Sequence, residues 1–191
     1  MKRKKGAFYI LLLAVLLAAC GNNSEIKDDA QGREVNREIK ELPVVEEKIT
    51  LSAVGDILIH DRVYDDAETE EGYDFSPMLA EVKPYLEEAD ITVANQETMI
   101  GGEEIGLSGY PSFNSPYEVG DALKDAGVDV VTQANNHTLD RGEEAIQNAI
   151  RHWEEIDMMY TGAYKDQEDR DQMRIFETEQ NISVGDWIRY I

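Results

Sequence analysis

Three short polar segments carry side chains that could bind a metal ion or transfer a proton. Each begins where an apolar run of the chain ends, and the segments are GDILIH (55–60), NQE (95–97) and NNHTLD (135–140). The candidate ligands are Asp56, His60, Glu97 and Asn136, accompanied by His137 and Asp140. Carboxylate, amide and imidazole groups suit divalent Mn, Fe, Zn or Mg ions. Because buried carboxylates and imidazoles are costly unless paired or metal-bound, the three segments together indicate a metal site.

Each candidate also has a purely structural explanation, which the residues alone leave open. Asp56 could cap a turn, His60 could be an ordinary surface histidine, and Glu97 could be solvated. Residues 136–137 could form a polar turn that caps the next helix. Asp140 is the weakest ligand candidate, because it could be the N-cap of that helix or could orient the preceding histidine from behind.

The spacing of apolar residues predicts alternating strands and helices. The predicted strands are 49–55, 90–97, 128–134, 158–163 and 172–179. The predicted helices are 76–89, with Ser76 as its N-cap, 116–127 and 141–156. This alternation is typical of an α/β fold with a largely parallel sheet covered on both faces. Ligands of such sheets bind beyond the carboxyl ends of the strands, which is where the three polar segments lie.

Composition and motifs exclude several other functions. The formal net charge of −22 argues against nucleic-acid binding, which needs a basic surface. The single cysteine excludes an intrachain disulfide and a thiolate zinc site. No G-x-S-x-G segment is present to indicate a serine hydrolase. The glycine-rich segment 102–114 matches neither a Walker loop nor a dinucleotide fingerprint, and we expect a surface loop near the metal site.

The first residues resemble a bacterial lipoprotein signal. Four basic residues in MKRKK precede the apolar stretch GAFYILLLAVLLAA, and LAAC follows with the only cysteine, Cys20. We expect a signal peptide at 1–19, lipidation of Cys20, a flexible tether at 20–48 and the folded domain at 49–191. An uncleaved membrane anchor is the alternative. Either places the domain on the extracytoplasmic face of the cell membrane.

The segments AVGDILIHDRV, VANQETMI and TQANNHTLDRGEEAI resemble the CapA family of poly-γ-glutamate capsule biosynthesis proteins. PSFNSP resembles that family's F-x-x-P segment, and the resemblance covers about residues 49–165. The family is a branch of the calcineurin-like metallophosphoesterases, so the resemblance implies a four-layer α/β/β/α sandwich. It implies that Asp56 and His60 bind a first metal, that Glu97 bridges two metals and that Asn136 binds the second. His137 would face the substrate as a general acid or phosphate contact.

The sequence departs from that family in its histidines. Family sites also use histidines from the second half of the fold, whereas this chain has only His60, His137 and His152, and we read the last as structural. We therefore expect the N-terminal half of the sandwich in a truncated chain, with an open sheet edge, an uncovered apolar face and an incomplete metal site.

Three functions stay open for this chain. It could be a metal-dependent phosphoesterase-like protein of capsule assembly, a non-catalytic subunit that binds polymer or partners, or an inactive fragment. The expected partners are the capsule polymer or its precursor and the membrane subunits of a synthase.

Overall fold

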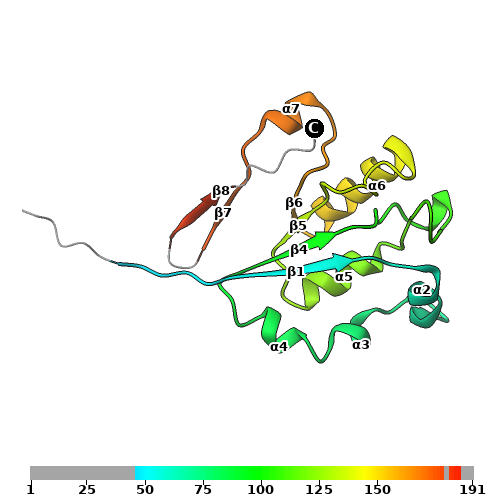
Figure 1. The fold of residues 1–191 in the computed structure, drawn as a ribbon, viewed down its shortest axis with the longest axis horizontal. Helices are drawn as coiled ribbons and strands as arrows, with labels where there is room; N and C mark the ends of the chain where they lie inside the picture. The colour runs from blue at the N-terminus through cyan, green and yellow to red at the C-terminus, as the bar shows by residue number, and fades with distance from the viewer. Residues whose placement is uncertain (1–45, 179–180, 186–191) are drawn as a thin grey trace, which may run out of the picture. The chain divides into compact units, whose positions relative to one another are not determined.

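A four-stranded parallel sheet organises the domain. The computed structural model describes residues 46–178 and 181–185, all within the compact unit Val45–Ile191. The strands are β1 (Leu51–Ile57), β4 (Ile91–Gln96), β5 (Val130–Thr132) and β6 (Met159–Thr161). They pair in the order β1-β4-β5-β6, and every pair is parallel (Figure 1). The predicted α/β class with a parallel sheet is confirmed, and it agrees with the expected half of a metallophosphatase-like sandwich. The signal peptide, Cys20 and the tether up to residue 45 lie outside the described residues.

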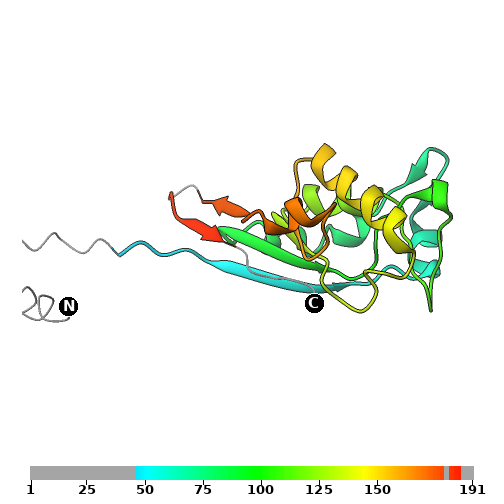
Figure 2. The same ribbon diagram turned by 90° about the horizontal axis from the view of Figure 1, so that it is seen from above.

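The main helices lie on one face of this sheet, whereas the sequence pattern predicted cover on both faces. Figure 2 shows α5 (Glu118–Asp125) and α6 (Gly142–Glu155) on the same side of β1 and β4. The strand order advances in one direction, and right-handed crossovers then place successive connections on one face. On the opposite face, Leu51 of the edge strand β1 is 58% exposed and Ala53 is exposed as well. Among the described residues the cover is therefore one-sided, which differs from the two-sided cover indicated by the strand–helix alternation and agrees with the uncovered apolar face expected for half of the sandwich.

The hydrophobic core lies between the sheet and these two helices. Ala94 of β4 and Val131 of β5 are fully buried against the helical side. Trp153 of α6 is also fully buried, and Gly120 of α5 lets the two helices approach each other closely. A Cβ atom at Gly120 would lie only 2.6 Å from Cζ3 of Trp153. Gly127, with φ near +92°, directly follows the C-cap of α5.

The segment predicted as one helix over 76–89 forms two short helices instead. These are α3 (Ser76–Leu79) and α4 (Lys83–Leu86), and Pro84 lies in the first turn of α4. Proline has no N–H to donate and its ring clashes with the preceding turn, so it interrupts a continuous helix. Ser76 is the first residue of α3, and Phe75 occupies the N-cap position predicted for Ser76.

Smaller elements complete the described part of the chain. They are α2 (Asp61–Ala67), the hairpin of β2 (Glu68–Thr69) and β3 (Gly72–Tyr73), the 3₁₀ helix η2 (Glu103–Ile105) and α7 (Gln167–Asp171). The predicted strand 172–179 contains β7 (Ile175–Glu177), which pairs with β8 (Ser183–Gly185) outside the parallel sheet. Among the described residues, no helix has the length and apolar character needed to cross a membrane.

Candidate functional site

The polar segments meet at the carboxyl edge of the parallel sheet. Asp56 lies near the end of β1, and Glu97 follows β4 directly. Residues 135–140 follow β5 and lead to α6. The pairing of β1 with β4 shifts register between Val54 and Ile57, and this irregularity includes Asp56. Parallel pairing therefore brings side chains from three distant segments to one place.

Two carboxylates adjoin each other at this edge. The pKa of Glu97 is raised by burial first, and then by the charge of Asp56 and a hydrogen bond with it; the charge of His137 opposes the rise. Asn95 donates a 2.6 Å hydrogen bond from Nδ2 to Oδ1 of Asp56. Burial beside a second carboxylate makes ionisation of Glu97 costly unless a cation is present. The oxygen donors of this pair thus fit the chemistry of a divalent ion.

His137 lies between the acid pair of Asp56 and Glu97 and a third carboxylate, that of Asp140. Its Nε2 is 3.7 Å from Oε1 of Glu97, and its Nδ1 is 2.8 Å from Oδ2 of Asp140. Only 15% of the His137 side chain is exposed. An Asp140 carboxylate at Nδ1 favours a proton on that nitrogen, which leaves Nε2 as the atom that can accept or release a proton toward Glu97.

The turn NNHT fixes the direction of this histidine. Asn135 accepts a 2.8 Å hydrogen bond from the His137 backbone N–H through Oδ1, and donates from Nδ2 to the Gln96 carbonyl at 3.1 Å. Thr138 Oγ1 lies 2.9 Å from the Asn135 carbonyl and also contacts the Gln133 carbonyl. The polar residues after β5 therefore close a turn through their own side chains and join it to the end of β4.

The other two predicted ligands lie at the exposed rim. The His60 side chain is 47% exposed, with Nδ1 at 3.4 Å from Oδ1 of Asp61, and Asn136 is exposed. Across residues 46–178 and 181–185, no group of three or more His, Cys, Asp or Glu side chains is arranged to hold a metal ion. The structure thus brings Asp56, Glu97 and His137 together, and the expected ligand roles of all four residues, Asp56, His60, Glu97 and Asn136, stay predictions.

The glycine-rich loop over 102–114 is held by hydrogen bonds beside this edge. The Arg141 guanidinium donates to the carbonyl of Ile105 at 2.6 Å, to that of Gly106 at 2.9 Å and to Ser108 Oγ at 2.6 Å. A Cβ atom at Gly109 would lie 3.2 Å from the backbone nitrogen of Asp61 and close to the preceding His60 ring. The loop therefore packs against the segment that carries His60.

Two residues of the site were not assigned a role from the sequence. Asn95 stands one residue before the end of β4, and its polar side chain in an apolar strand was the available signal. Phe113 is 1% exposed and its ring contacts both His60 and His137. Its place in the F-x-x-P-like segment indicated a shared motif, but no sequence spacing gives contacts between side chains so far apart in the chain.

His152 lies away from this edge, as expected for a structural histidine. Its Nε2 is 3.0 Å from Oδ1 of Asp121, and its ring stacks on Tyr117 with centroids 4.9 Å apart. Burial, followed by a hydrogen bond with Glu104, raises the pKa of Tyr117 to about 12. This cluster joins α5 to α6 and contains none of the predicted ligands.

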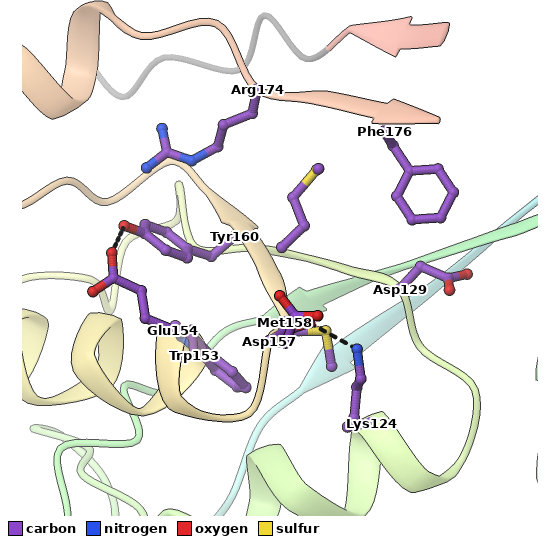
Figure 3. Close-up of a pocket in the computed structure, with 10 residues that line it drawn as sticks. Lys124, Asp129, Trp153, Glu154, Asp157, Met158, Tyr160, Arg174 and Phe176 are labelled. Atoms are coloured by element: carbon purple, nitrogen blue, oxygen red, sulfur yellow. Dashed lines mark hydrogen bonds between the residues drawn. The ribbon is translucent and has the colours of Figure 1, made fainter. Parts of the chain in front are cut away.

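A cavity of about 460 Å³ lies at the opposite ends of the strands (Figure 3). Its lining includes Tyr160, Phe176 and Arg174. Arg174 lies over the Tyr160 ring at 4.4 Å, and the Tyr160 hydroxyl donates to Glu154 at 3.3 Å. Met158, which also lines the cavity, directly precedes β6. The cavity therefore lies at the amino end of the sheet and not at the carboxyl edge that holds Asp56 and Glu97.

Comparison with known families decides where this chain belongs. Residues 50–186 match the family described as bacterial capsule synthesis protein PGA_cap, which is well over half of the chain. The chain belongs to the PGA_cap family. The resemblance inferred from the three polar segments is therefore confirmed, and the matched region contains all of the candidate residues except Cys20.

Relatives of this PGA_cap chain include proteins with and without an assigned role. The capsule biosynthesis protein CapA of Bacillus anthracis is 30% identical over 123 residues, which cover 61% of this chain and 29% of that protein. The uncharacterized proteins y4sH and y4uA of Sinorhizobium fredii (strain NBRC 101917 / NGR234) are each 28% identical over 136 residues, covering 68% of this chain and 28% of each relative. The matches thus span less than a third of the length of these relatives.

Proposed function

We propose that this protein acts in the assembly of a capsule polymer of the poly-γ-glutamate type. We propose also that the carboxyl edge of its sheet around Asp56 and Glu97, called the acidic edge below, binds a divalent metal ion. Membership of the PGA_cap family supports the first part. The adjoining carboxylates of Asp56 and Glu97, with His137 Nε2 at 3.7 Å from Glu97, support the second. The proximity of these two carboxylates is the observation that carries the proposal, because a bound cation would favour the ionised form of the buried Glu97.

The residues of this site would have separate roles in metal binding and proton transfer, as in a metallophosphoesterase-like site. Asp56 and Glu97 would hold one ion, which supplies Lewis-acid activation of a phosphoryl or related oxygen when bound. Mn, Fe, Zn or Mg ions fit this donor set, and Asn136 with His60 would supply further ligands from the rim. His137 would hold or release a proton at Nε2 beside the substrate, while Asp140 keeps its other nitrogen protonated.

A cellular test separates this role from a merely structural one. In cells that make the polymer, Glu97→Gln in the protein should lower polymer yield about tenfold or more, as losses at metal ligands and their partners do. Asp66→Asn on the exposed face of α2 is the matched control and should leave the yield unchanged. Equal yields from wild type and Glu97→Gln, at equal protein levels, would refute a working role for the acid pair.

We propose further that Cys20 carries lipid and holds the domain at the extracytoplasmic face of the cell membrane. The basic, apolar and small-residue order before Cys20 supports this proposal. Labelling with a radioactive fatty acid should mark the wild-type protein and should fail for Cys20→Ser. Equal labelling of both proteins would refute lipidation at this residue.

An alternative is a non-catalytic subunit that binds the membrane part of a capsule synthase. The exposed apolar residues of the edge strand favour it, because Leu51 is 58% exposed and Ala53 is exposed on the same face. Leu51→Asp should then abolish co-purification with the synthase membrane subunits and leave metal binding intact. Unchanged co-purification would refute this alternative for that face.

A further inference from the structure

The Phe113 ring contacts both His60 and His137, and no hydrogen bond between these two histidines is described. Its ring centroid lies 5.1 Å from that of His60 and 4.8 Å from that of His137, and both interplanar angles are 89°. Edge-to-face contacts of this kind are the favoured geometry between aromatic rings. One side chain therefore contacts both an imidazole that follows β1 and one that follows β5.

The backbone of Phe113 acts on His137 by a second route. The Phe113 N–H donates a 2.9 Å hydrogen bond to Oδ2 of Asp140, which is the same oxygen that lies 2.8 Å from His137 Nδ1. The neighbouring Ser112 donates from Oγ to the Asp140 carbonyl at 2.8 Å. The loop thus holds both the ring of His137 and the carboxylate that orients it.

His60 depends more heavily on the ring contact. Its side chain is 47% exposed, and its ion contact is a 3.4 Å approach of Nδ1 to the adjacent Asp61. Phe113 is 1% exposed, and its neighbour Asn114 is fully buried, with side-chain hydrogen bonds to the N–H of Gly101 and the carbonyl of Gly102. A rigid ring is therefore placed against a histidine that has few other restraints.

We propose that Phe113 is a positioning residue that holds the imidazoles of His60 and His137 in one fixed arrangement for the site at the acidic edge. The inference rests on the proposed function only in assuming that these two histidines take part in binding or catalysis at that site. The position of both rings is a property of the metal-free protein. It can therefore be tested without metal and without activity.

Nuclear magnetic resonance of histidine-labelled full-length chain, at one fixed pH and without metal, tests the proposal. Phe113→Leu should shift the imidazole resonances of both His60 and His137, because the aromatic ring current is lost. His152 stacks on Tyr117 and is the internal reference, so its resonances should not move. Phe75→Leu is the matched control for loss of a buried phenylalanine, and it should move none of the three.

Shifts of His60 and His137 that are no larger than that of His152 would overturn the proposal. If Phe113→Leu does not fold, nuclear Overhauser contacts in the unaltered chain decide: the Phe113 ring protons must contact both imidazoles, and their absence overturns it. A Mn²⁺ titration adds a functional readout, with binding expected to be about tenfold weaker in Phe113→Leu. If wild type binds no Mn²⁺, the proposed function fails while the resonances still decide the role of Phe113.

Discussion

Asp140→Ala should cost this domain much more stability than an ordinary loop substitution. Its Oδ2 accepts from the Phe113 N–H at 2.9 Å and contacts His137 Nδ1 at 2.8 Å, and only 14% of the side chain is exposed. Each hydrogen bond to a charged group contributes about 1.5–3 kcal/mol, and the two share one oxygen, so we expect a total loss of about 3 kcal/mol. For a domain of this size that corresponds to a fall in melting temperature of about 10 °C.

Urea denaturation of wild type and variants measures this loss as a change in the free energy of unfolding at constant m-value. Asp140→Asn keeps the shape and one oxygen acceptor but removes the charge, so it should cost only about 1 kcal/mol. The exposed Asp66→Ala should change the free energy by less than about 0.5 kcal/mol. An Asp140→Ala loss as small as that of Asp66→Ala would refute the described role of the carboxylate.

Three further changes test other parts of the account. Arg141→Ala removes three hydrogen bonds to the glycine-rich loop and should cost roughly 2 kcal/mol, with faster amide hydrogen exchange at Gly106; unchanged exchange there would contradict the loop contacts. The pKa of Glu97 is raised above its ordinary 4.5, so in the metal-free protein the protonated Glu97 side chain contributes its full stabilisation of the fold below about pH 4.5. That contribution is lost as the pH rises through the pKa of Glu97 in the folded state. Glu97→Gln should therefore lose less stability than wild type between pH 4.5 and 7, and parallel urea series showing equal slopes would refute the crowded acid pair. Gly120→Ala brings a Cβ to 2.6 Å from the Trp153 ring and should destabilise by about 1–3 kcal/mol in urea despite the better helix propensity of alanine; a stabilised variant would contradict the close helix contact.

The strands could be predicted, and so could the position of their carboxyl ends at one edge of the sheet, because both follow from local sequence patterns. Short runs rich in valine and isoleucine gave the strands, and the alternation with helices gave parallel pairing. Parallel pairing then required Asp56, Glu97 and His137 to lie at one edge, which the structure describes. Pro84 was a sequence signal against one continuous helix over 76–89, but that prediction followed the apolar stripe alone.

The side-chain directions within the site could not be predicted from spacing. The turn after β5 exposes Asn136 and turns His137 inward because Asn135 and Thr138 bond the local backbone. Likewise, the position of Phe113 depends on a loop that is held both by its own Asn114 side chain and by bonds to the distant Arg141, which sequence spacing does not reveal. The one-sided cover of the sheet depends on strand order, which periodicity does not reveal.

Electron paramagnetic resonance of Mn²⁺ titrated into the full-length chain at pH 7 measures whether the carboxyl edge of the sheet binds a metal ion. We expect saturable binding by wild type and by Asp66→Asn, and binding at least about tenfold weaker in Glu97→Gln, since a ligand at the acidic edge is lost. Binding of equal strength in wild type and Glu97→Gln, or no saturable binding by wild type, would contradict a metal site at the carboxyl edge of this sheet.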